Sequence, residues 1–91
     1  SEIVLNGGYG GFGLHPQAIS VYEAATQKVD VWEYDINRTD PVLVKIVKKM
    51  GKGSWGDSAK LRVERLKSKK FYIAEYDGLE RVYTDKDMIR V

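Results

Sequence analysis

A glycine-dense loop near the start of the chain is the feature that most restricts how this sequence can fold. Glycines stand at positions 7, 8, 10, 11 and 13, directly after an apolar run at 3–5 and directly before a segment with helical spacing. Glycine loses more backbone freedom on folding than any other residue, so a loop this rich in glycine indicates positive φ angles or close backbone approach. Between a strand and a helix, such a loop can also turn its N–H groups toward an anion. The loop therefore predicts a site for a small anionic ligand such as a nucleotide or a phosphate ester.

The composition is that of one ordinary globular domain spanning residues 1–91. A chain of this length buries a modest core, so we expect homo-oligomerisation to add burial. No apolar run approaches the roughly 20 residues of a membrane-spanning helix, and residues 1–3 do not resemble a signal peptide. We therefore expect no membrane partner and a cytoplasmic location.

Residue types restrict the chemistry further. The sequence contains no cysteine and one histidine, which argues against disulfides, thiol nucleophiles and a histidine-ligated zinc centre. We expect no metal and no cofactor. The net charge of +2 is small, although lysines cluster near 45–52 and 67–70. A weakly basic total does not favour a nucleic-acid partner, because such domains are usually clearly basic.

Local patterns predict the secondary structure. Residues 2–6 are expected to form a strand, and Pro16 to begin a helix with apolar residues at 18, 21, 22 and 25. Residues 29–36 are rich in β-branched and aromatic types, which predicts a second strand. Asp40 and Pro41 are an N-cap and first-turn pair, and Gly51 ends that second helix.

The last third of the chain has a strand pattern. Residues 60–66 alternate, and residues 71–76 and 79–83 flank Asp77-Gly78, a strong hairpin signal. The predicted order is β-α-β-α-β-β-β. We expect an α/β (α+β) fold, a compact two-layer sandwich with a mixed sheet and two helices on one face. The first two strands are expected to be parallel, joined by a right-handed crossover.

Parallel strands would bring the glycine loop and the segment after residue 34 to one edge of the sheet, where ligands collect in open α/β sheets. Arg38 could pair there with a phosphate, and Asp35 could accept from a ribose hydroxyl. Positions 8–13 fit G-x-G-x-x-G, a weak signal when it stands alone. The predicted ligand-binding residues are Gly8, Tyr9, Gly10, Gly11, Phe12, Gly13, Asp35 and Arg38. Alternatively, the glycines only let two aromatic residues fold back onto the sheet.

The aromatic residues of the loops also have two interpretations. Tyr9 and Phe12 could stack on a base, or they could anchor a protein interface. Lys52 and Trp55 could form a lid or an interface, or Trp55 could simply cover the edge of the core. His15 at the loop exit is more typical of a helix cap than of a general base.

Three ordered motifs resemble a family of small proteins from tailed bacteriophages and large DNA viruses. These motifs are YGGFGL at 9–14, DINRTDPVLV at 35–44 and EYDGLE at 75–80. Members of that family often carry serine at the His15 position and acidic residues where Lys48 and Lys49 stand. The resemblance implies a viral protein acting in the host cell, and it implies no particular activity.

Three functions remain open at this point. The first is sequestration of a nucleotide-derived host defence signal, such as a cyclic nucleotide, by the glycine-rich loop. The second is inhibition of a host protein through aromatic anchors. The third is an enzyme acting on phosphoesters, which the sequence favours least because no catalytic motif accompanies the loop.

Overall fold

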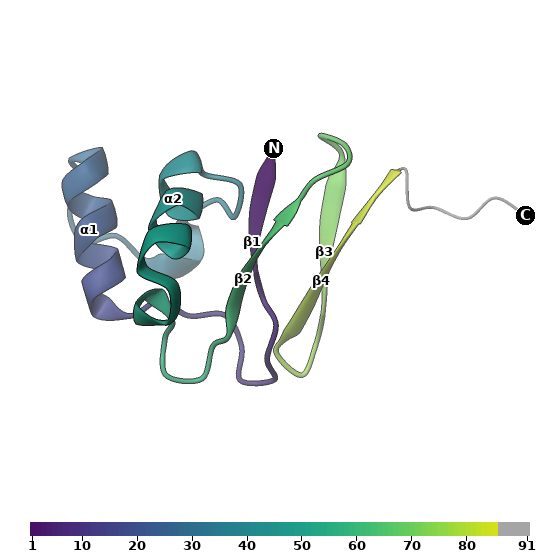
Figure 1. The fold of residues 1–91 in the computed structure, drawn as a ribbon, viewed down its shortest axis with the longest axis horizontal. Helices are drawn as coiled ribbons and strands as arrows, with labels where there is room; N and C mark the ends of the chain where they lie inside the picture. Colours follow the sequence, from purple (N-terminus) through teal and green to yellow (C-terminus); the bar gives the residue numbers. More distant parts are fainter. Residues whose placement is uncertain (86–91) are drawn as a thin grey trace, which may run out of the picture.

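The computed structural model describes residues 1–85. It contains two α-helices, two short 3₁₀ turns and four strands (Figure 1). In chain order these are β1 (Glu2–Asn6), α1 (Pro16–Thr26), η1 (Glu33–Asp35), α2 (Pro41–Met50), η2 (Gly51–Ser54), β2 (Leu61–Arg65), β3 (Phe71–Tyr76) and β4 (Leu79–Thr84).

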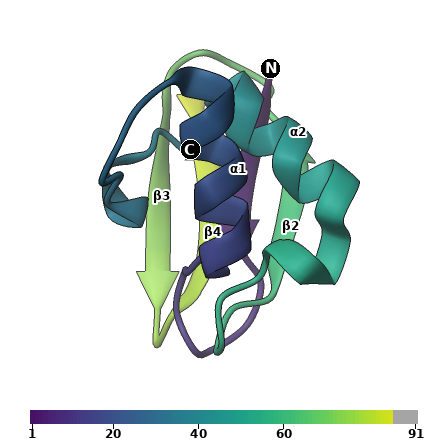
Figure 2. The ribbon, with the colours of Figure 1, turned by 90° about the vertical axis from the view of Figure 1, so that its left-hand side faces the viewer.

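The four strands form two antiparallel pairs. Strand β1 pairs with β2, and β3 pairs with β4, as separate two-stranded sheets. The β3–β4 turn consists of Asp77 and Gly78, whose φ angles of 52° and 90° place both in the left-handed region that two-residue hairpin turns need. Strands β1 and β4 lie side by side, so the spatial order is β2, β1, β4, β3 (Figures 1 and 2).

Capping side chains fix where each helix begins. The His15 imidazole accepts from Gln17 N at 3.0 Å, and the Asp40 carboxylate accepts from Val42 N at 2.8 Å. Each cap satisfies a backbone N–H that would otherwise lack a partner at the helix start. Gly51, with φ of 56°, ends α2. These three boundary residues, His15, Asp40 and Gly51, agree with the sequence predictions, and His15 is a helix cap.

Both helices lie on one side of the strands (Figures 1 and 2). The core between the helices and the strands draws on α1, α2, β1, β2 and the glycine loop. Its buried members include Val4, Phe12, Leu14, Tyr22, Leu43, Ile46, Val47 and Leu61. Ile3 and Leu5, which alternate with Val4 along β1 and so lie on its other face, are also fully buried. Among residues 1–85, no helix is both long and apolar enough to cross a membrane.

The α+β class and the two helices on one face are therefore confirmed, and one predicted strand is wrong. Residues 29–36 contain η1 instead of a strand. Asp30 has a φ of 52°, and Val29 and Trp32 are largely exposed. Two side chains hold the segment in its turn: Glu23 accepts from Val31 N, and Glu33 accepts from Leu14 N, each at 2.9 Å. The parallel strand pair is consequently absent from the described sheets, whose pairs are antiparallel.

One buried hydrogen bond joins the two helices. Tyr22 Oη of α1 donates to the Asp40 carboxylate at 2.6 Å, the same carboxylate that caps α2. This hydrogen bond to a carboxylate, together with burial, raises the pKa of Tyr22 to about 12. The protonated phenol therefore stabilises the fold fully below about pH 10, and this contribution is lost as the pH rises toward 12.

We predict that Tyr22→Phe lowers the free energy of unfolding by about 1.5–3 kcal/mol at pH 7, because a hydrogen bond to a charged group is removed. Urea unfolding measures this, and the gap between the variant and the wild type should narrow above pH 10. Tyr34→Phe is the matched control, since Tyr34 is 57% exposed. Equal stability of Tyr22→Phe and the wild type at pH 7 would contradict the role of this bond.

Candidate functional site

Close packing of three loops explains the glycines near the N-terminus. A Cβ at Gly10 would overlap Ser58, and a Cβ at Gly78 would overlap the backbone of Tyr9 and Gly11. A Cβ at Gly56 would lie 2.8 Å from the carbonyl carbon of Gly13. The glycine loop thus packs directly against the β3–β4 turn and against the loop before β2.

The buried side chain of Asn6 ties these same loops together. Its amide nitrogen donates to the carbonyls of Gly8 and Gly78, at 2.8 and 2.6 Å. Its Oδ1 accepts from Gly8 N and from Lys60 N. One fully buried residue therefore fixes the entry to the glycine loop, the start of β2 and the hairpin turn.

Arg38 lies beside the glycine loop, as predicted, and its guanidinium is held by the protein itself. It forms a two-point ion pair with Glu80 of β4, at 2.6 and 2.8 Å. The guanidinium carbon also lies 3.6 Å from the centre of the Phe12 ring, which is a cation–π distance. Glu80 in turn accepts from the backbone N of Asn6. Arg38 thus joins β4, the glycine loop and β1, and a phosphate at Arg38 would have to displace Glu80.

The hollow beside the predicted loop residues has acidic walls. It measures about 360 Å³ and is lined by residues 11–14, Pro16, Glu33, Tyr34 and residues 56–59. Its charged side chains are Glu33 and Asp57. Carboxylates next to a bound anion are unfavourable, so this hollow is poorly suited to a phosphate.

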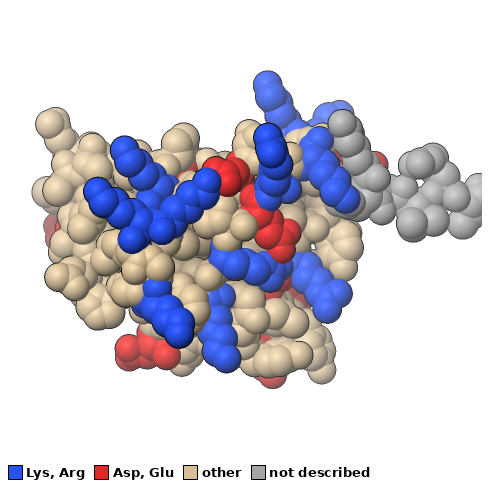
Figure 3. Space-filling view, viewed as in Figure 1, with Lys and Arg blue, Asp and Glu red and all other residues tan. Residues whose placement is uncertain are grey.

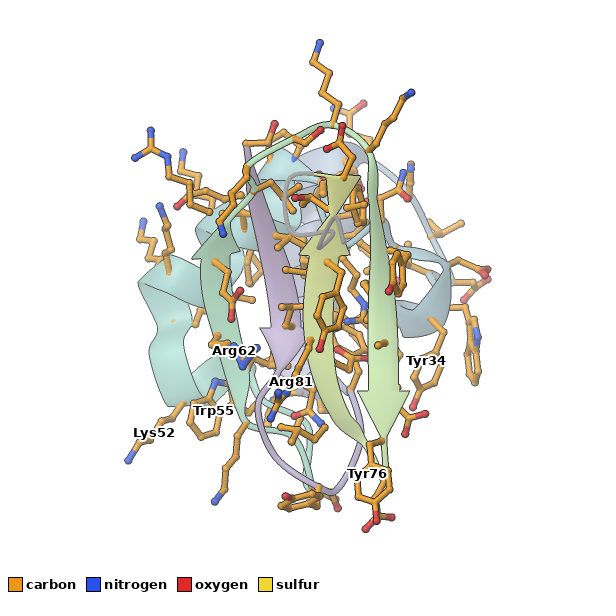
Figure 4. The ribbon with its side chains drawn as sticks, turned by 90° about the vertical axis from the view of Figure 1, so that its right-hand side faces the viewer. Tyr34, Lys52, Trp55, Arg62, Tyr76 and Arg81 are labelled. Carbon is orange, nitrogen blue, oxygen red and sulfur yellow. The ribbon has the colours of Figure 1, made fainter. Side chains whose placement is uncertain are left out.

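The remaining predicted site residues are spread over the surface. Asp35 ends η1 with an exposed side chain, so its expected position at the end of a strand was wrong. Trp55 packs against the core, which agrees with its structural interpretation, and Lys52 is exposed in η2 (Figure 4). Of the two loop aromatics, Phe12 is buried and Tyr9 is 64% exposed.

A second groove brings Tyr9 together with the outer face of the β3–β4 hairpin. It measures about 330 Å³ and is lined by Tyr9, Ala74, Glu75, Tyr76, Leu79, Arg81 and Tyr83. The Tyr83 ring also stacks on the Tyr72 ring, with centroids 5.6 Å apart. The groove therefore combines aromatic faces with one arginine and one carboxylate, that of Glu75, which accepts from Gly78 N. The helices lie on the opposite side of the strands (Figures 2 and 4).

Most of these groove residues were not among the predicted site residues, although the sequence contained their signal. The Asp77-Gly78 turn fixes the register, which pairs Tyr72 with Tyr83, Ala74 with Arg81 and Tyr76 with Leu79. Alternate residues of paired strands share a face, so these six side chains lie on one surface. The opposite surface carries Ile73, Val82 and the buried Glu80 and faces the core. Aromatic residues repeated on the solvent side of a predicted hairpin are the signal that identifies this groove.

Comparisons with known proteins give no relative from which a site could be transferred. A scan against protein-family models found no match, and searches of curated proteins and of solved structures found none.

We predict that Gly10→Ala destabilises the fold by more than about 2 kcal/mol, because the new methyl group overlaps Ser58. Gly53→Ala is the matched control: its Cβ would meet nothing within 4 Å. That substitution should be neutral or stabilising by up to about 1 kcal/mol. Thermal unfolding measures the Tm of the Gly10→Ala and Gly53→Ala variants. Equal Tm values would show that the glycine loop is not closely packed at Gly10.

We predict that Arg38→Ala lowers the free energy of unfolding by about 3–5 kcal/mol, because Glu80 is left buried without its partner. Arg38→Met combined with Glu80→Gln should recover much of this loss, since the glutamine oxygen can still accept from Asn6 N. Urea unfolding of the single and double variants separates the two effects. A single variant within 1 kcal/mol of the wild type would refute the structural role of this ion pair.

Proposed function

We propose that the protein binds a nucleotide-containing anion in the groove between Tyr9 and the outer face of β3–β4. The observation that carries this proposal is the convergence of exposed tyrosines and one arginine on a face without a covering helix. Such a groove offers the two contacts that a nucleotide needs, a stacking surface for the base and a cation for the phosphate.

The aromatic side of the groove supports base binding. Tyr9 and Tyr76 are 64% and 77% exposed, so their ring faces are open to a ligand. A base stacked on an aromatic side chain contributes about 1–3 kcal/mol, and every base has a face that can stack. The groove is therefore suited to nucleotides as a class.

The arginine side supports phosphate binding. Among residues 1–85, no carboxylate forms an ion pair with the Arg81 guanidinium. Its fork can therefore bind a phosphate in the two-point geometry that arginine favours. Arg38, which the sequence favoured for this role, is held by Glu80 instead.

The glycine loop contributes to this site by placing Tyr9. Its packing against Gly78 brings the loop to the hairpin turn, next to which Tyr9 and Tyr76 line the same groove. Taken with the resemblance to viral proteins, binding without turnover would sequester a nucleotide-derived signal in the cytoplasm of a host cell.

Interaction with a host protein is the second candidate, and the edge of β3 favours it. Phe71 and Tyr72 are 39% and 59% exposed on a strand that pairs only with β4 in the described sheets. Exposed aromatic residues on an unpaired strand edge are suited to a partner that adds a strand. Phe12 and Trp55 are not available as its anchors, because both pack into the core.

Calorimetry with linear and cyclic nucleotides tests the proposed site. We expect Tyr76→Ala and Tyr9→Ala each to weaken binding by about tenfold or more, as loss of a stacking contact predicts. Tyr34→Ala is the control, because Tyr34 is similarly exposed but lines the acidic hollow instead. Equal loss in Tyr34→Ala would move the site to that hollow, and no binding of any nucleotide by the wild type would refute the proposal.

A further inference from the structure

The Tyr9 groove is one end of a longer path across the molecule. It shares Arg81 and Tyr83 with a hollow of about 400 Å³ that Arg62 and Glu64 of β2 also line. That hollow shares Glu64 and Tyr83 with another of about 230 Å³, which reaches Arg65 and Lys67. These three hollows therefore follow one another from Tyr9 to the end of β2.

The path ends in a groove that is larger than these three hollows. This groove measures about 870 Å³ and lies between α2 and Arg65, where Lys45, Lys48 and Lys49 line it. Figure 3 shows lysine and arginine side chains gathered over α2 and around β2. Figure 4 shows Arg62 and Arg81 side by side on β2 and β4.

The charge of this path differs from the charge of the whole protein. Seven cationic and three acidic side chains line the four hollows, a net charge of +4. The complete sequence has a net charge of only +2. The rest of the sequence therefore has a net charge of −2. Four of the seven cations line the α2 groove, and the other three lie in hollows that Tyr83 also lines.

We propose that the ligand of this surface is a single strand of nucleic acid, whose bases stack at the Tyr9 groove and whose backbone continues to the α2 lysines. This inference rests on the proposed nucleotide site and extends it. Aromatic residues followed by a cationic groove are the combination with which sequence-tolerant single-strand binders hold their ligands.

The chemistry of the path favours a phosphodiester chain over an acidic protein partner. The centre of a protein interface is depleted in charge, whereas the centre of this path carries Arg81 and the ion pair of Arg62 with Glu64. Three of the four cations in the α2 groove are lysines, point charges that attract phosphates without requiring a fixed geometry. Tyrosine faces next to these cations match an unpaired base, which a duplex would keep stacked inside its helix.

Fluorescence anisotropy with labelled oligo-dT and oligo-U of 4, 8 and 16 nucleotides tests the inference, with a mononucleotide measured alongside by calorimetry. We expect the affinity to rise with oligonucleotide length. We also expect it to fall with salt, by about 0.7 logarithmic units per phosphate contact for each tenfold increase in salt concentration. Lys45→Ala combined with Lys49→Ala should weaken 16-mer binding by about tenfold or more and leave mononucleotide binding unchanged. Lys28→Ala is the matched control, because Lys28 is an exposed lysine outside the path.

The outcomes separate this inference from the proposed nucleotide site. One outcome is mononucleotide binding that depends on Tyr76, with an affinity that does not increase with oligonucleotide length. This outcome would overturn the inference and retain the nucleotide site. Oligonucleotide binding that is unaffected by Tyr76→Ala would overturn both. Equal affinity for a 16-base-pair duplex, or for poly-glutamate, would overturn the single-strand assignment.

Discussion

The buried contact of Arg38 with Glu80 holds the two halves of the molecule together. Strands β1 and β4 are neighbours that belong to separate two-stranded sheets, so no strand pairing joins the β1–β2 pair to the β3–β4 hairpin. Side chains connect them instead: Glu80 binds the Arg38 guanidinium and the backbone N of Asn6, and Asn6 binds the hairpin turn at Gly78. Charge-assisted hydrogen bonds in a partly buried setting depend strongly on geometry, and this connection therefore specifies how the β3–β4 hairpin is oriented.

That orientation determines which surfaces stay open. The inner face of the β3–β4 hairpin contributes Glu80 to the junction, and the outer face, with Tyr72, Tyr76 and Tyr83, is left to solvent. A hairpin joined by a continuous ladder would need no buried arginine, and Arg38 would then be free for a ligand. The residue that the sequence indicated as a phosphate partner is instead the one that positions the face on which we place the ligand.

Local sequence signals predicted most helix and strand boundaries. Contacts between residues far apart in the sequence determine which side chains line each groove. The caps at His15 and Asp40, the end of α2 at Gly51 and the Asp77-Gly78 turn depend on neighbouring residues, so their patterns were sufficient. Residues 29–36 have strand composition but form no strand, because Glu23 accepts from Val31 N and Glu33, within the segment, accepts from the distant Leu14 N. In the same way, the glycines looked like a phosphate loop, since nothing local reveals that Ser58 and Gly78 press against them. The sequence therefore indicated Tyr9 as a candidate ligand contact, whereas its neighbours in the groove follow only from the register of the β3–β4 hairpin.

The total charge does not show how the charged residues are arranged on the surface. Fifteen basic and thirteen acidic residues nearly cancel, which argued against a nucleic-acid partner. The fold distributes them unevenly. Glu80 binds Arg38 and Glu33 accepts from a backbone N–H, while the α2 lysines and Arg81 lie along a path on which cations outnumber carboxylates. An anion approaching this surface responds to the nearby charges within about 8–10 Å, and not to the sum over the chain. A nearly neutral small protein can thus present a strongly cationic track, provided that its acidic residues are used to hold the fold together.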